Sequence, residues 1–201
     1  VPPQIYLLMH YVRKNPELIK QAPALLRKLG WRGVMSRLHG KGVRDAGYRY
    51  LTPRLTASVK SQLACFKEQP LISIIMPVYN VDPKYLKAAV SSLQQQWYTN
   101  WELCIADDRS THENLIKYLD TLDEPQITIQ RSKNNGNISA ASNLALEMAK
   151  GEFIGLMDHD DELTPDALYE VVKAINNEDA EFIYSDEDKL ELDGTHTDPH
   201  F

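Results

Sequence analysis

The stretch GLMDHDDELTPD brings three carboxylates, Asp158, Asp160 and Asp161, into four positions at the end of an apolar run. Like charges this close repel one another, by about 1 kcal/mol for two unit charges 4 Å apart in water. A divalent cation offsets this repulsion, and hard oxygen ligands suit Mg²⁺ or Mn²⁺. Mg²⁺ typically takes one or two carboxylates and completes its shell with the phosphates of its ligand. The spacing therefore indicates a metal that bridges protein carboxylates and a diphosphate.

A helix start gives the same stretch a second interpretation. Thr164 is followed by proline and aspartate, which is typical of a helix N-terminus, where acidic residues are favoured. A helix start explains Glu162, but Asp158 and Asp160 lie four to six residues before the cap. Spacing alone leaves the metal site and the helix start as open alternatives.

Other binding motifs are excluded by position. Counted from Asp158, a calcium loop needs glycine at its sixth position and glutamate at its twelfth, where Leu163 and Tyr169 stand. His159 has no second histidine at zinc-ligand spacing, which favours a solvent-facing or hydrogen-bonding role. Neither GxGxxG nor GxxxxGK[ST] occurs, so neither the dinucleotide fingerprint nor the P-loop is supported.

The sequence predicts alternating strands and helices as the elements that position these residues. Apolar runs predict five strands, in LISIIMPVY, WELCIADD, QITIQRS, EFIGLMD and AEFIYSD. Helical spacing predicts helices in DPKYLKAAVSSLQQQW, THENLIKYLDTL and ISAASNLALEMAKG, and from Thr164 to about Asn176. Thr111 and Thr164 are expected as N-caps and Gly151 as a left-handed helix stop. The pattern predicts an α/β domain with a mostly parallel sheet covered by helices on both faces.

Ligands of such sheets bind outside the carboxyl ends of the strands. Five segments are expected there: PVYN (77–80), DDRS (107–110), KNNGN (133–137), DHDD (158–161) and SDED (185–188). Tyr79 offers a flat surface for a base, and Asp108 can accept a hydrogen bond from the imide nitrogen of a pyrimidine. Structural roles explain these segments equally well. PVYN can be the turn that ends a strand, Asp108 can form an Asx-type turn, and NNGN can be a tight turn.

Charge divides the chain into two predicted parts. Residues 1–69 hold 13 Lys/Arg and 3 Asp/Glu, whereas residues 70–201 hold 9 Lys/Arg and 25 Asp/Glu. We expect a basic helical extension and linker (1–69) before the α/β domain (70–201). The extension is suited either to peripheral contact with a membrane or to packing on its own domain, and no motif supports nucleic acid. The absence of a secretory signal and of a cysteine framework predicts a cytoplasmic protein, peripheral at the inner face of the membrane.

The segments PLISIIMPVYN, WELCIADDRS and NNGNISAASNLALEMAKGEFIGLMDHDDELTPDAL, in this order, resemble the family 2 glycosyltransferases with the GT-A fold. The resemblance covers about residues 70–190, and DHDDEL and SDEDK are similar to bacterial members that build cell-surface polysaccharides. It implies a nucleotide-sugar donor, Mn²⁺ or Mg²⁺, a glycan or lipid-linked glycan acceptor, and an inverting single displacement. UDP- or dTDP-linked sugars fit a pyrimidine pocket.

Matched by position, the resemblance implies roles for individual residues. The nucleoside pocket would be lined by Pro77, Val78, Tyr79 and Asn80, with Asp108 on the base and Asp107 nearby. The metal and donor would be held by Asp158, His159, Asp160 and Asp161, with Lys133 and Asn137 approaching the donor. Ser142 stands where many relatives carry arginine, which leaves one donor contact unassigned. The family's catalytic base comes later than Phe201, so we expect these residues to bind donor but to turn over poorly.

A phosphoacceptor receiver module is the alternative from another class. It too has an acidic pair after one strand and an aspartate two strands later, here Asp107, Asp108 and Asp158. The additional PVYN strand and the lack of a following strand that ends in lysine count against it. We therefore predict the transferase and keep the receiver as its rival.

Overall fold

The computed structural model describes residues 49–191 and 193–200, in two compact units. The larger unit is Thr52–Ile183, and the described residues of the smaller unit are 49–51, 184–191 and 193–200. Most of the predicted basic helical extension (1–69) lies outside the described residues. Within the described part, no helix combines the length and apolar character needed to cross a bilayer.

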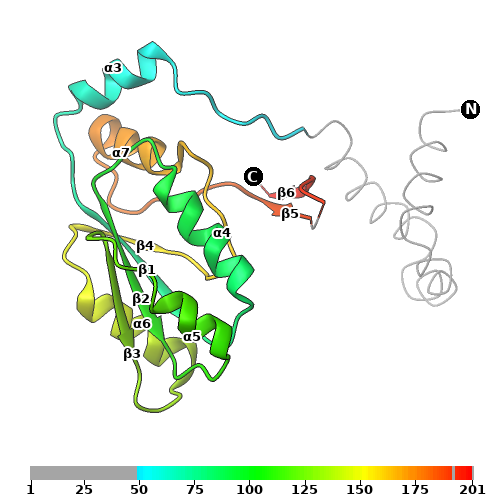
Figure 1. The fold of residues 1–201 in the computed structure, drawn as a ribbon. Coiled ribbons are helices and arrows are strands. Elements are labelled where there is room, and N and C mark those ends of the chain that lie inside the picture. Colours follow the sequence, from blue (N-terminus) through cyan, green and yellow to red (C-terminus); the bar gives the residue numbers. More distant parts are fainter. Residues whose placement is uncertain (1–48, 192, 201) are drawn as a thin grey trace, which may run out of the picture. The chain divides into compact units, whose positions relative to one another are not determined.

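Four parallel strands form the centre of the larger unit (Figure 1). They are β1 (Ile72–Val78), β2 (Trp101–Asp107), β3 (Ile127–Arg131) and β4 (Phe153–Leu156), in the order β3-β2-β1-β4. Every residue of β2 is buried, as its continuous apolar run predicts for a strand covered on both faces. Because all three pairings are parallel, the loops that follow the four strands leave the sheet at one edge.

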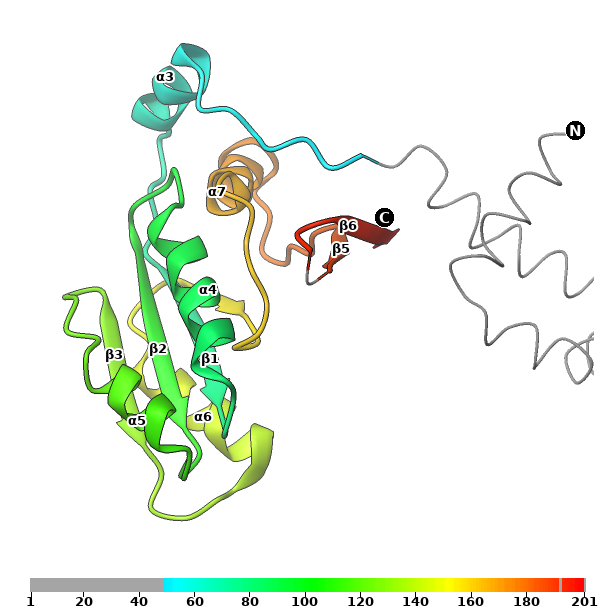
Figure 2. The same cartoon turned by 45° about the vertical axis from the view of Figure 1, so that its right-hand side comes forward.

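Helices cover both faces of this sheet, as predicted (Figure 2). Four helices connect or follow the strands: α4 (Pro83–Gln94), α5 (Glu113–Leu119), α6 (Asn137–Met148) and α7 (Ala167–Glu178). Buried side chains of α4, α5 and α7 join Ile72, Ile74 and Met76 in the main core. Ala141 and Ala145 of α6 pack on the opposite face, where small residues let the helix approach the sheet closely. Another helix, α3 (Ala57–Cys65), precedes β1.

Two predicted N-caps are wrong, by one and two residues. His112, not Thr111, caps α5, because its ring nitrogen Nδ1 accepts a hydrogen bond from the backbone N–H of Leu115. Helix α7 begins at Ala167 with Asp166 as its N-cap, so Thr164 lies in the preceding loop. Local propensity places such caps only approximately, since several neighbouring polar residues can serve.

Gly151 has another role than the predicted left-handed stop. Helix α6 already ends at Met148, and Gly151 does not adopt a positive φ. A Cβ atom on Gly151 would lie 2.4 Å from the carbonyl oxygen of Leu71 and 2.8 Å from the backbone nitrogen of Ser73. The glycine is therefore required by close backbone approach at the beginning of β1.

The predicted fifth strand, AEFIYSD, is also wrong. Phe182 and Tyr184 are 87% and 86% exposed, and among the described residues no strand pairs with this segment. Instead β5 (Glu187–Leu190) pairs antiparallel with β6 (His196–His200) in the smaller unit. Alternating aromatic residues favour a strand locally, but a strand also requires a neighbour to satisfy its backbone groups.

Candidate functional site

The end of β1 anchors the loops that follow its two neighbours. The backbone N–H of Asp108, after β2, donates a 2.8 Å hydrogen bond to the carbonyl oxygen of Val78. Nδ1 of His159, after β4, lies 3.1 Å from the carbonyl oxygen of Pro77. A carbonyl oxygen can only accept, so Nδ1 of His159 carries a proton. Consecutive carbonyls of β1 thus hold the loops that contain the predicted base contact and the predicted metal ligands.

Asp108 is buried and oriented by the loop after β3. Its Oδ1 accepts a 2.8 Å hydrogen bond from the backbone N–H of Gly136, and Nδ2 of Asn135 donates to its carbonyl oxygen at 3.3 Å. Its second carboxylate oxygen, Oδ2, has no hydrogen-bond partner in the described part of the chain. Within the described residues Oδ1 of Asp108 is thus held by Gly136 and Oδ2 is not hydrogen-bonded, while the residue as a whole is 2% exposed.

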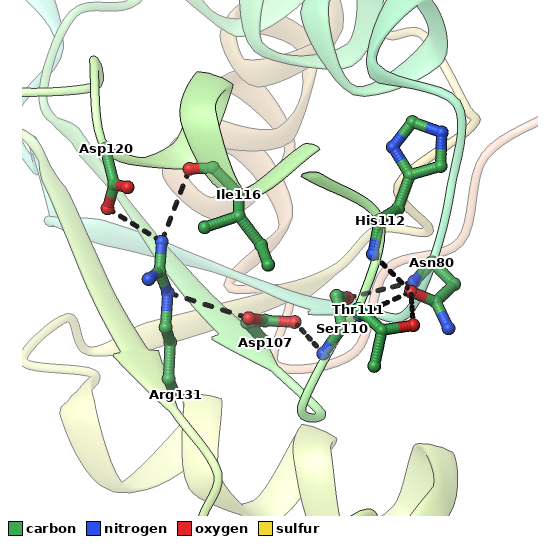
Figure 3. A network of polar contacts seen from close by, with 8 residues as sticks. All are labelled: Asn80, Asp107, Ser110, Thr111, His112, Ile116, Asp120 and Arg131. Atoms are coloured by element: carbon green, nitrogen blue, oxygen red, sulfur yellow. Dashed lines mark hydrogen bonds and ion pairs between the residues drawn. The ribbon is translucent and has the colours of Figure 1, made fainter. Parts of the chain in front are cut away.

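Asp107 is engaged entirely within the protein (Figure 3). Its Oδ1 accepts a 2.9 Å hydrogen bond from the backbone N–H of Ser110, and its Oδ2 lies 3.6 Å from Nε of Arg131. Arg131 also pairs with Asp120 at 2.8 Å. The turn within this loop is thus made by Asp107, whereas the sequence suggested an Asx-type turn at Asp108.

Asn80 fixes the same loop from the β1 side (Figure 3). Its Oδ1 accepts hydrogen bonds from the backbone N–H groups of Thr111, at 2.7 Å, and His112, at 3.1 Å. Its own N–H donates to Oγ of Ser110 at 2.9 Å. Asn80 adopts φ 47°, a left-handed conformation that asparagine tolerates better than most residues. Its side-chain oxygen is therefore occupied in positioning α5.

The other residues of the predicted nucleoside pocket differ in accessibility. The side chain of Val78 is part of the hydrophobic core, and Pro77 is half-buried. Tyr79 is 50% exposed and is the member of PVYN that presents an aromatic ring to solvent. Lys133 and Asn137 are both exposed on the β3–α6 connection, and Asn137 adopts φ 65° as the first residue of α6.

The acidic residues after β4 contrast with Asp107 and Asp108. Asp158, Asp160 and Asp161 are exposed, and in the described structure the carboxylates of Asp158 and Asp160 have no hydrogen-bond or ion-pair partner. The acidic residue in the first turn of α7 is Glu170. Helix formation therefore does not account for Asp158 and Asp160.

A complete metal site is not formed by protein groups in the part of the chain that is described. Between residues 49 and 200, leaving out 192, no group of three or more His, Cys, Asp and Glu residues is arranged to hold an ion. Two unpartnered carboxylates nevertheless fit Mg²⁺ or Mn²⁺ if the ligand's phosphates supply the remaining oxygens. These two carboxylates therefore fit a metal ion that binds together with a diphosphate.

The segment SDED does not follow a strand of the four-stranded sheet. Its Asp188 interacts with Nδ1 of His196 at 2.9 Å, within the smaller unit. The structure also adds residues that sequence reasoning missed, namely Ser110, Asn135 and Gly136. The glycine in NNGN was interpreted only as a turn residue, although a glycine also permits close approach of a backbone N–H to a neighbouring loop.

Comparisons with known proteins agree with this architecture. A family model described as "Glycosyl transferase family 2" matches residues 73–198. The uncharacterized protein y4gI of Sinorhizobium fredii is 47% identical over 135 residues, which are 66% of this chain and 15% of that protein. The putative colanic acid biosynthesis glycosyl transferase WcaA of Escherichia coli is 43% identical over 103 residues, 51% of this chain and 37% of that protein. The chain thus spans a minor part of these relatives.

A solved structure that matches with a TM-score of 0.50 gives the same fold. The structure of GalNAc-T7 with UDP, GalNAc and Mn²⁺ matches with a TM-score of 0.50 at 20% identity, over 55% of this chain and 21% of that one. Staphylococcus aureus TarS 1-349 in complex with UDP-GlcNAc is 29% identical with a TM-score of 0.47, over 52% and 30% of the two chains. The predicted fold class, a GT-A type sheet with helices on both faces, is confirmed for the described residues.

Proposed function

Because the chain belongs to glycosyl transferase family 2, we propose that its carboxyl-edge loops bind a nucleotide-sugar donor together with Mn²⁺ or Mg²⁺. In this proposal residues 70–201 are the donor-binding part of a larger protein that transfers the sugar to a growing bacterial surface glycan. The names of similar proteins support it: besides WcaA, the O-antigen biosynthesis protein RfbC of Myxococcus xanthus is 29% identical over 152 residues.

One observation carries the proposal: the four aspartates at this edge are of two kinds. Asp107 and Asp108 are buried and hydrogen-bonded, whereas Asp158 and Asp160 are exposed and without partners among the described residues. Buried, oriented carboxylates suit recognition of a base, and unpartnered exposed ones suit a cation. One edge of one sheet thus offers both functions that a nucleotide diphosphate requires.

Asp108 is the proposed determinant of the base. Its Oδ2 can accept a hydrogen bond from the imide N–H of uracil or thymine, while Oδ1 remains bonded to Gly136. Cytosine carries no proton at the equivalent ring nitrogen and would place an acceptor against a carboxylate. UDP- or dTDP-linked sugars are therefore the proposed donors, with the base stacked on the exposed ring of Tyr79.

Asp158 and Asp160 are the proposed metal ligands, with Asp161 beside them. When bound, the ion would stabilise the negative charge that develops on the diphosphate leaving group. His159 holds the loop between the two ligands to the end of β1 through its contact with Pro77. Lys133 lies on the exposed β3–α6 loop and Asn137 is the exposed first residue of α6, and both are proposed to approach the donor from that side.

The proposed transfer is an inverting single displacement. The acceptor hydroxyl attacks the anomeric carbon from the face opposite the diphosphate, the bond to the diphosphate oxygen breaks, and a base removes the hydroxyl proton. None of the acidic residues described above is assigned as that base. The proposed acceptor is a glycan or lipid-linked glycan.

The receiver-like alternative is not favoured. The family model covers the loops that contain Asp107, Asp108 and Asp158. Asp107 and Asp108 are each held by contacts that orient them within the sheet edge. Treatment with a small phosphodonor is therefore expected to give no mass increase from phosphorylation of Asp158.

Calorimetric titration with UDP, dTDP, CDP and GDP, with and without Mn²⁺, tests the donor site. We expect UDP or dTDP to bind, and Mn²⁺ to strengthen binding. The substitution Asp160→Ala should remove the Mn²⁺-dependent component, whereas Asp123→Ala, at an exposed aspartate outside the site, should retain it. Normal Mn²⁺-dependent binding by the Asp160→Ala variant would contradict the metal assignment, and no binding of any nucleotide would contradict the donor site.

A further inference from the structure

A shallow groove of about 650 Å³ lies between α4 and α5 and has a cationic lining. Lys84, Lys87 and Lys117 line it, together with one carboxylate, Asp82. Residues 70–201 contain only nine Lys/Arg against 25 Asp/Glu. A third of the cations in this acidic part of the chain therefore gather in one groove.

The carboxylates near these lysines neutralise them only weakly. Nζ of Lys84 lies 3.6 Å from Asp82, and Nζ of Lys117 lies 3.9 Å from Glu113, with all four side chains largely exposed. Exposed pairs of this kind contribute little and exchange readily with solvent or ligand. Lys87 has no carboxylate within ion-pair distance among the described residues. The lining of the groove therefore holds three lysines against one carboxylate, and Lys87 keeps its charge free of an ion pair within the described residues.

The groove also offers an apolar surface and a neutral hydrogen-bond donor. Nζ of Lys87 lies 5.2 Å from the ring centroid of Tyr118, a half-buried lining residue. His112, another lining residue, accepts the backbone N–H of Leu115 at Nδ1, so in its neutral form Nε2 carries the proton. Aromatic rings pack on the CH faces of sugars, while lysine and imidazole N–H groups bind carboxylates.

The position of the groove connects it with the candidate donor site. The backbone N–H of His112 donates to Oδ1 of Asn80, the residue that ends the PVYN segment after β1. One end of the groove therefore lies beside the loops at the carboxyl edge of the sheet. A polymer in the groove would lead toward the site at which we place the nucleotide sugar.

We propose that the α4–α5 groove binds a glycan whose sugars carry carboxylate groups, as a segment of the acceptor. The half-buried Tyr118 ring, which lies beside Lys87 in the lining, favours a carbohydrate strand over a membrane surface. The inference rests on the proposed function, because it identifies the ligand with the glycan that is extended.

Titration of the full 201-residue chain with a hyaluronan decasaccharide tests this inference. In this probe every second sugar carries a carboxylate, and maltodecaose serves as the neutral counterpart. The double substitution Lys87→Gln with Lys117→Gln should weaken hyaluronan binding about tenfold, as expected for two solvent-exposed ion pairs. The matched control, Lys60→Gln with Lys67→Gln, removes the same charge from exposed positions outside the groove and should bind as the parent does.

Each outcome discriminates between interpretations. Equal hyaluronan binding by both double variants, or equal binding of maltodecaose and hyaluronan by the parent, would overturn the glycan groove. So would lysine-dependent cosedimentation with phosphatidylglycerol vesicles in the absence of hyaluronan binding. UDP binding with Mn²⁺ should be the same in both double variants. If UDP fails to bind while hyaluronan binding depends on Lys87 and Lys117, the proposed donor site is wrong. The assignment of the groove as a binding site for a carboxylated glycan is then retained.

Discussion

Oδ1 of Asp108 and the backbone nitrogen of Gly136 lie 2.8 Å apart, and this hydrogen bond joins the loop after β2 to the loop after β3. The two residues are 28 positions apart in the chain. The bond leaves Oδ2 of Asp108 as the oxygen that can meet a ligand. A Cβ atom on Gly136 would lie 2.6 Å from Cβ of Ala140 but 3.9 Å from Oδ1 of Asp108, so the glycine is required by packing at the start of α6.

Substitution of Asp108 by asparagine should change base preference. The amide oxygen can still accept the N–H of Gly136, but an NH₂ group then replaces the acceptor Oδ2. A donor facing the imide N–H of uracil leaves both groups unpaired, which costs about 1–3 kcal/mol, or roughly tenfold to a hundredfold in affinity. We expect weaker UDP binding and improved CDP binding, measured by calorimetry. Unchanged preference for UDP over CDP would show that Asp108 does not contact the base.

Substitution of Asn80 by alanine should destabilise the larger unit. It removes the acceptor of the N–H groups of Thr111 and His112, and alanine disfavours the positive φ at this position. Together these effects should lower the free energy of unfolding by about 1–3 kcal/mol, measured by urea denaturation. Asn80→Asp keeps an acceptor oxygen and tolerates the same backbone conformation, so it serves as the control. Equal loss of stability in both variants would contradict the assigned role of the side-chain oxygen.

Gly151→Ala should affect stability but not nucleotide binding. The added Cβ would meet the Leu71 carbonyl oxygen at 2.4 Å, where backbone rather than a flexible side chain must move. We expect a loss of about 1–3 kcal/mol in the free energy of unfolding. This position lies at the beginning of β1, opposite the edge where Asp108 and Asp158 lie, so the UDP affinity of the folded fraction should be unchanged. A specific loss of UDP affinity would indicate that the two ends of the sheet are coupled.

The two cysteines should differ in reactivity. Burial in the sheet raises the pKa of the Cys104 thiol to about 11, from an ordinary value of 9.0, while Cys65 is exposed. At pH 8 iodoacetamide should label Cys65 within minutes and leave Cys104 unmodified in the folded protein, as followed by mass spectrometry of peptides. Because the thiol of Cys104 is held protonated, its contribution to stability is complete below pH 9 and is lost as the pH rises toward 11. Rapid labelling of Cys104 at pH 8 would contradict its burial.

The sheet and its helices were largely predictable because their signals are local. The apolar runs of β1 and β2 are buried on both faces, and such runs have few alternatives in a folded domain. In α4, which helical spacing predicted, Leu86, Ala89, Val90 and Leu93 recur at that spacing and are buried, whereas Tyr85 is exposed. The strand expected in AEFIYSD was wrong because pairing is a property of two segments, and its own pattern describes only one.

The sequence by itself determined that the segments after β1, β2, β3 and β4 gather at one edge of a parallel sheet, because strand direction follows from alternation of strands and helices, whereas SDED, also expected there, follows none of these strands. Only the tertiary structure decided which contacts each carboxylate makes there. Both carboxylate oxygens of Asp107 have partners, in Ser110 and Arg131. One oxygen of Asp108 accepts a hydrogen bond from Gly136. Asp158 and Asp160 have no such partners in the described residues. Contacts between loops far apart in sequence thus distinguish bonded from unpartnered aspartates. The side chains are identical, so the difference arises only when the chain folds.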